Sequence, residues 1–156
     1  MAGHIAYVLH VLFAVLWVGG MAFALLALRP ALGALEPAQR LALMGGVHRR
    51  FFLVVWHAMP IVLLSGYWLL FGHYGGFRGV GWHVHLMHLT GLLMGAVFVA
   101  IFTGPWRQMR AALGGQDLAA AAVANARIGQ LVMLNLALGL LTVAVASFGS
   151  LTGRLG

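Results

Sequence analysis

Three histidines stand at the head of an apolar stretch, residues 81–95 (GWHVHLMHLTGLLMG). His85 and His88 are one helical turn apart, so their imidazoles project to nearly the same side of a helix. Imidazole is the commonest metal ligand in proteins, and a histidine inside a membrane is costly unless it has a partner. Gly91, about one turn further on, removes side-chain bulk from the helix. The stretch is therefore suited to hold a metal, or a flat cofactor, against imidazole and bare backbone.

A histidine in another apolar run lies at the same depth. At 1.5 Å per residue, His10 is roughly 8 Å and His88 about 9 Å from the same end of their runs. His85 is shallower by about one turn. Trp17 and Met21 follow His10 at spacings of seven and four, which places all three on one helix face. We therefore expect His10 and the His85/His88 pair to lie in one layer of the membrane and to bind a common ligand. The alternative is that His10 only forms a hydrogen bond with one of them, which fixes helix packing.

A second layer is expected around His57, which lies roughly 9 Å from the opposite face. Asn135 of the last apolar run falls at similar depth and is its expected hydrogen-bond partner. Pro60 removes one backbone N–H and should bend the helix beside His57. The other histidines are expected to be solvated at the membrane interface or beyond it: His4, His48, His73 and His83.

The elements that carry these residues are four long apolar runs. The chain has 156 residues, of which 63% are hydrophobic and only 7% charged, against about a quarter charged in soluble proteins. Each run has the roughly 20 residues needed to cross a hydrocarbon core of about 30 Å. The sequence predicts an all-α integral membrane four-helix bundle, one transmembrane domain over residues 1–156, with spans at about 5–28, 51–71, 82–103 and 128–148.

The basic residues predict the orientation of the bundle. All nine are arginines, and seven follow the first or third run: Arg29, Arg40, Arg49, Arg50, Arg107, Arg110 and Arg127. Only Arg78 and Arg154 fall on the other side. Because cytoplasmic loops carry the excess of Lys and Arg, both long loops should be cytoplasmic and both termini outside, periplasmic in a bacterial inner membrane. Membrane orientation thus explains the net charge of +7, and no nucleic-acid partner is expected.

The composition excludes several kinds of chemistry. There is no cysteine, which rules out disulfides and thiolate metal sites. The only acidic residues, Glu36 and Asp117, lie in loops, so the spans have no carboxylate pair for acid–base catalysis. The loops should be partly helical, with a short helix over 37–44 ended by Gly45 and Gly46, and with Asp117 as the N-cap of the last helix.

Several segments resemble the CopD superfamily of small four-helix membrane proteins, which includes the copper-resistance protein D domain and the HemJ-type protoporphyrinogen oxidases. They are LHVLFAVLWVGGMAF, Arg29-Pro30, HRRFF, SGYWLL, HLMHLTGLLM and GPWRQMR. His10 and Trp17 match the first-helix pattern of both branches, and His85 matches the third-helix histidine. HemJ proteins have a lysine two residues after that histidine, where this chain has Met87. The pattern is therefore more similar to the CopD branch, and His88 is an additional histidine.

Together these features predict a b-type haem protein of membrane electron transfer, with the haem between spans one and three. Bis-histidine ligation suits electron transfer because both axial positions of the iron are filled. His10 and a histidine of span three, His85 in preference to His88, would be the ligands, with His57, Trp17 and Gly91 also in the cofactor site. The partners would be the lipid bilayer and a quinone or another membrane redox partner.

Three alternatives remain open from the sequence. The first is copper binding or transport across the membrane, with His10, His85 and His88 as metal ligands and Met87 favouring Cu(I). The second is a HemJ-like protoporphyrinogen oxidase. The third is an accessory subunit of a membrane redox complex.

Overall fold

The structure is a computed structural model that describes residues 1–152, with side chains described for residues 1–149. Its described secondary structure is helical throughout. The main elements in chain order are α1 (Ala2–Phe23), a π-helix (Ala24–Leu28), α2 (Arg29–Ala31), α3 (Pro37–Gly72), α4 (Trp82–Thr103), α5 (Pro105–Gly114) and α6 (Leu118–Thr152). Short 3₁₀ turns cover Leu32–Ala34 and Phe77–Gly79.

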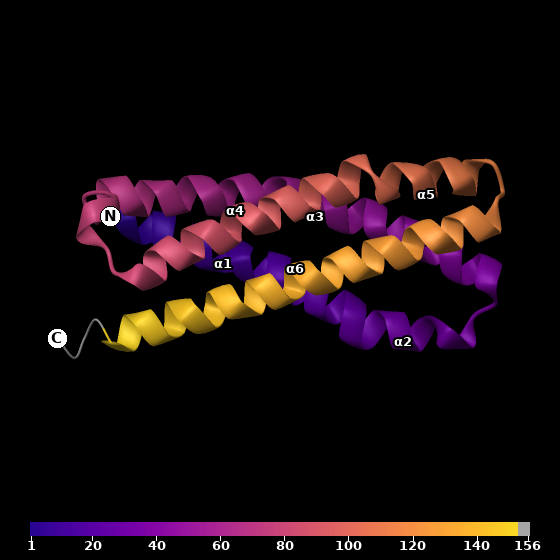
Figure 1. Cartoon of the computed structure of the whole chain (residues 1–156), viewed down its shortest axis with the longest axis horizontal. Coiled ribbons are helices and arrows are strands. Elements are labelled where there is room, and N and C mark those ends of the chain that lie inside the picture. Colours follow the sequence, from indigo (N-terminus) through magenta and orange to yellow (C-terminus); the bar gives the residue numbers. More distant parts are fainter. Residues whose placement is uncertain (153–156) are drawn as a thin grey trace.

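Four helical rods run the length of the molecule (Figure 1). Each is long and apolar enough to cross a membrane; they are Ala2–Ala34, Pro37–Gly72, Trp82–Gly114 and Leu118–Gly149. The predicted all-α four-helix membrane bundle is confirmed. Every rod exceeds the roughly 20 residues that a hydrocarbon core requires. The bundle is therefore longer than the apolar part of a membrane is thick.

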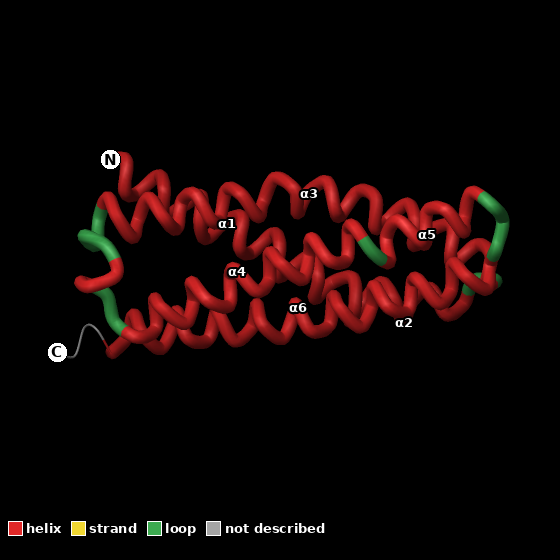
Figure 2. Tube along the Cα trace, turned by 45° about the horizontal axis from the view of Figure 1, so that its top comes forward, coloured by secondary structure: helices red, strands yellow, loops and turns green. Residues whose placement is uncertain are grey.

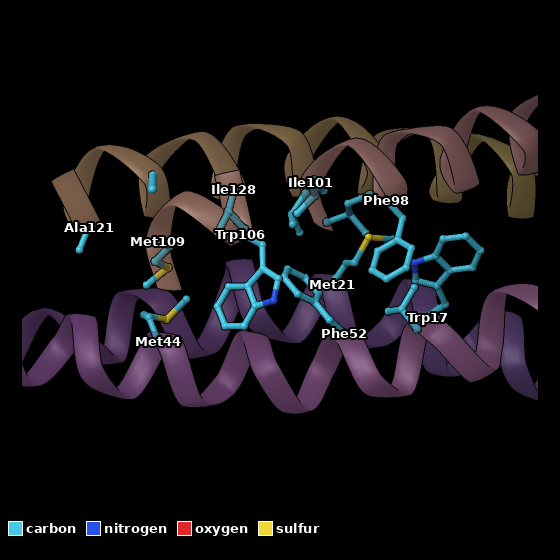
Figure 3. Close-up of a cluster of buried hydrophobic side chains, with 14 of the residues drawn as sticks. Trp17, Met21, Met44, Phe52, Phe98, Ile101, Trp106, Met109, Ala121 and Ile128 are labelled. Carbon is cyan, nitrogen blue, oxygen red and sulfur yellow. The ribbon is translucent and has the colours of Figure 1, made fainter. Parts of the chain in front are cut away.

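The rods pack as two pairs. α1 lies mainly against α3, while α4 and α5 lie mainly against α6, and direct packing between α1 and α4 is sparse. Between the pairs, a continuous core of buried side chains fills the middle of the bundle and the end that carries α2 and α5 (Figure 3). Trp17 and Met21 of α1, Phe52 of α3 and Phe98 of α4 meet in this core. Large apolar side chains on all four rods face outward, as expected of a bundle whose solvent is lipid.

The two ends of the bundle differ in charge. The N-terminus, the last described turns of α6 and the turn between α3 and α4 lie at one end, and the other two connections lie at the opposite end (Figures 1 and 2). The seven arginines expected in the cytoplasm lie on the half of each rod nearer that opposite end. Arg78 lies in the turn at the N-terminal end of the bundle, and Arg154 lies outside the described residues.

Two expectations for the loops had different outcomes. Asp117 caps α6 as predicted, because the backbone N–H of Ala120 donates to its Oδ1 at 2.9 Å. The short helix ending at Gly45 is wrong, since α3 runs without a break from Pro37 to Gly72. A Cβ at Gly45 would lie 2.8 Å from Leu113 Cδ1 of α5. This glycine therefore permits a close helix contact and does not end a helix.

We predict that Phe52→Ala destabilises the bundle much more than Leu53→Ala. Phe52 is 2% exposed and contacts the rings of Phe98 and Trp106, whereas Leu53 is 56% exposed and faces outward. The expected cost for Phe52 is about 3 kcal/mol, the low end for a buried phenylalanine, because lipid replaces water as the solvent of the exposed state. Reversible unfolding in mixed detergent micelles measures it. Equal losses in the two variants would contradict the described core.

Candidate functional site

A cavity of about 330 Å³ lies between the two helix pairs, toward the end that carries the N-terminus. We call it the histidine cavity, because its walls include His10 of α1 and both His83 and His88 of α4. Its remaining walls are mostly apolar and come from all four rods. Trp17 and Met94, both buried in the core, close it toward the middle of the membrane. Its size falls within the usual range for small-molecule and cofactor sites.

His10 is held by the neighbouring helix. Its Nδ1 lies 2.9 Å from the backbone oxygen of Val62 and 3.3 Å from Ser65 Oγ, both on α3. A carbonyl oxygen can only accept, so His10 donates from Nδ1–H and its Nε2 carries the free lone pair. Metal-bound histidines are usually oriented in this way, by a second-nitrogen hydrogen bond that fixes the tautomer and the ring direction. This orientation leaves the lone pair of His10 Nε2 available for coordination.

Ser65 and Gly66 of α3 also lie against the His10 ring. The Ser65 hydroxyl donates to the carbonyl of Ile61 at 2.5 Å, which turns its oxygen toward the helix and the imidazole. Gly66 lies directly under the ring, since a Cβ there would be 3.1 Å from His10 Cε1. Neither residue was among the predicted site residues. The available signal was a serine–glycine pair inside an apolar span, within the SGYWLL segment.

On α4, the structure places His88 on the cavity wall and His85 off it. The wall residues Val84, Met87, His88 and Gly91 follow the three-to-four-residue period of one helix face. His85 lies outside this face; it is exposed and stacks on Phe77 with ring centres 5.7 Å apart. The preference for His85 rested on the family pattern. The cavity wall instead includes His88, together with His10 of α1.

His88 is also supported by neighbouring aromatic rings. Its imidazole lies edge-on to Tyr67 of α3, with ring centres 5.4 Å apart, and to Phe77 of the α3–α4 turn, 5.2 Å apart. These contacts come from two directions and limit the rotation of the ring. His88 thus joins His10 and His83 among the imidazoles that the two helix pairs present to one cavity.

Gly91 faces open space in the cavity. A Cβ at this position would meet no atom within 4 Å, apart from the local helix backbone. Gly95, one turn further, behaves differently, because a Cβ there would lie 3.4 Å from Met59 Sδ of α3. The two glycines of α4, four residues apart, therefore serve different purposes. Gly95 leaves room for the side chain of Met59, and Gly91 enlarges the cavity.

His57 lies outside the site. It is exposed, and its Nδ1 is bonded to the backbone oxygen of Leu53, one turn earlier on the same helix, at 2.8 Å. Asn135 is 1% exposed, and its Oδ1 has no hydrogen-bond partner. The predicted His57–Asn135 pair is wrong because the buried face of α3 follows Phe52, Val55 and Ala58, and His57 lies on the outward face.

Two histidines expected in solvent are partly or wholly enclosed. His83 lines the histidine cavity, and its ring lies where a Cβ of Gly149 would be. His48 is only 8% exposed and stacks on Phe52, with ring centres 5.5 Å apart. The expectation for His48 is wrong because α3 begins at Pro37, well before the span expected at about residue 51. In this earlier part of the helix, the first turn of α5 covers His48 with Trp106.

The described residues form no ready site for a bare metal ion. Among them, no group of three or more histidine or acidic side chains is close enough to hold one ion. His10, His85 and His88 therefore do not converge as a three-imidazole metal site. The imidazoles come from separate walls of the cavity. This arrangement suits a large ligand that reaches more than one wall better than it suits a single metal ion.

We predict that Gly66→Ala displaces the His10 ring and that Gly91→Ala does not. The added methyl at position 66 would press on the imidazole and break its hydrogen bond to Val62, with a net cost of about 1 kcal/mol. The methyl at position 91 enters open space. Nitrogen NMR of labelled histidines in detergent should lose the hydrogen-bonded Nδ1–H signal of His10 only in Gly66→Ala. Retention of that signal in Gly66→Ala would show that the ring is not seated on this glycine.

Comparison with known proteins identifies the family. The family model described as copper resistance protein D matches residues 45–148, which covers most of α3 and all of α4 and α5, and reaches into the last turns of α6. No curated protein and no solved structure matches the chain. The match covers most of the chain, and the four apolar rods agree with an integral membrane protein. The chain belongs to the CopD family of membrane proteins.

Proposed function

We propose that this protein is a membrane-bound b-type haem protein that transfers electrons, with its haem in the histidine cavity between His10 and His88. The observation that carries the proposal is that these imidazoles, from different helices, line one largely apolar cavity that Gly91 leaves open. The fixed Nδ1 hydrogen bond of His10 supports a ligating role for its Nε2.

The chemistry of the walls fits such a group. Apolar side chains from four helices suit the faces and edges of a porphyrin, and Trp17 and Met94 exclude water from the membrane-centre side. A haem with two imidazole ligands supplies a one-electron carrier whose potential depends on axial ligands and burial. The protein would orient both rings, His10 through Val62 and His88 through Tyr67 and Phe77.

Copper is the second candidate, because the matching family is described by copper resistance. In the histidine cavity, copper as cargo would meet the imidazoles of His10 and His88 and the thioether of Met87, which lies on the same wall. Imidazole and thioether together suit Cu(I). The set differs from the predicted trio because His85 is off the cavity wall. No observation on the described residues favours a porphyrinogen oxidase or an accessory subunit.

The proposed orientation places the histidine cavity near the periplasmic face of a bacterial inner membrane. Seven exposed arginines lie toward the opposite end, and such an excess normally stays in the cytoplasm. Electrons would then leave or enter through a partner outside, or through a quinone in the outer leaflet.

The haem proposal predicts a specific pattern of histidine substitutions. Protein expressed with ample haem should purify with a Soret band. His10→Ala and His88→Ala should each abolish or strongly shift this band, and His85→Ala, the matched control three residues away, should leave it in place. Absorption spectra with a pyridine haemochrome assay measure the effect. A colourless protein that binds Cu(I) stoichiometrically would reject haem and favour copper.

The proposed orientation is testable because the native chain has no cysteine. Arg40 and Arg78 are both exposed and lie toward opposite ends of the bundle. In intact cells, an impermeant thiol reagent should label Arg78→Cys and should label Arg40→Cys only after the membrane is opened. The reverse labelling pattern would show that the protein has the opposite orientation in the membrane.

A further inference from the structure

A second, much smaller cavity lies near the arginine-rich end, where two segments that the proposed function leaves unused come together. We call it the arginine pocket; it is lined by Arg29 after the π-helix, by His48 of α3, and by Asn125 and Gly129 of α6. Arg29 belongs to the Arg29-Pro30 segment and His48 to the HRRFF segment. Its volume is about 20 Å³.

Two polar atoms at this pocket are buried without a partner. His48 is more than nine-tenths buried, and its Nδ1 has no hydrogen bond. The Oδ1 of Asn125, on another helix, is also buried and unbonded. Buried polar groups in folded proteins are nearly always bonded to protein or to ordered water. Because both residues line one cavity, a shared partner there would account for both atoms.

Arg29 brings a donor to the same pocket. Its guanidinium lies against the backbone of α6 at Gly129, where a Cβ would be 2.9 Å from Arg29 Cζ. Any larger residue at position 129 would push this group away. No ion pair joins Arg29 to an acidic residue in the described part of the chain, and Asp117 is already bonded as the cap of α6. The guanidinium N–H groups on the pocket side are available to an acceptor.

We infer that the arginine pocket binds one structural water molecule that links Arg29, His48 and Asn125. A site needs roughly 10–15 Å³ and two to four polar partners to hold a water, and this pocket provides about 20 Å³ and three partners. The water accepts a hydrogen bond from the guanidinium. It donates one to Asn125 Oδ1 and one to His48 Nδ1, so that each buried atom gains a partner.

A halide ion is the main competitor for this position. An anion accepts hydrogen bonds but donates none, so it would leave the oxygen of Asn125 unpaired and close to a like charge. Arg29 is also an exposed residue, so solvent screens its charge and weakens its attraction for a counter-ion. Water satisfies all three groups at once. It also ties the end of the first span to α3 and α6, independently of the histidine cavity.

A crystal structure of the full chain in a lipid phase, at a resolution that shows ordered waters, tests the inference. The expected result is a density peak within hydrogen-bond distance of all three side chains. An empty pocket would overturn the inference, as would a direct His48–Asn125 hydrogen bond. Crystals soaked in bromide test the halide: an anomalous peak in the pocket would also overturn it.

A pair of variants tests the role of Asn125. Asn125→Leu should remove the peak, because its side chain cannot accept the bond and fills part of the pocket. Asn135→Leu, at another buried asparagine with an unpaired oxygen, should leave the peak in place. A peak that survives Asn125→Leu would contradict the assigned partner. If Asn125→Leu does not fold, the native map still decides whether the water is present.

Discussion

The hydrogen bond from His10 Nδ1–H to the carbonyl of Val62 joins α1 to α3 inside the membrane and fixes the direction of an imidazole there. A polar side chain in lipid must find such a partner, so the bond satisfies His10 without using Nε2. Gly66 makes room for the ring, and Ser65 lies beside it. The rest of the proposed site depends on this arrangement. A ligand can bind between the two helix pairs only if the His10 imidazole already points into the cavity.

The division of the bundle into a packed part and an open part follows from side-chain size and position. Toward the arginine-rich end, Phe52, Phe98 and Trp106 fill the space between the helix pairs. Toward the end that carries the N-terminus, a cavity remains between the helix pairs, and Gly66, Gly91 and Gly139 contribute to its walls. The same pairing of helices therefore produces a closely packed region at one end of the bundle and a cavity toward the other end.

The four spans, the helical class and the cap at Asp117 could be predicted because each depends on local chemistry: run length, hydropathy and one N-cap. The depth argument also brought His10 and a span-three histidine toward one layer, and the structure places His10 and His88 on one cavity. The choice between His85 and His88 depends on the rotation of α4 about its axis. That rotation is set by packing against α6, which neither spacing nor depth reveals.

The failures have related physical causes. His48 and His57 were judged by distance along the chain from an assumed membrane boundary, and the Gly45-Gly46 pair was expected to end a helix. α3 instead runs far past that boundary, so His48 meets Trp106 of α5, and Gly45 meets Leu113. Ser65 and Gly66 were missed because their role exists only when α1 packs on α3. Contacts of this kind belong to tertiary structure and leave little trace in a single sequence.

The most direct test of the site is magnetic resonance of the purified, oxidised protein grown with ¹⁵N-labelled histidine. The proposed site predicts a low-spin haem iron coupled to the nitrogens of two imidazoles, with one coupling lost in His10→Ala. An iron coupled to fewer than two imidazoles, or a cupric signal in place of iron, would contradict it.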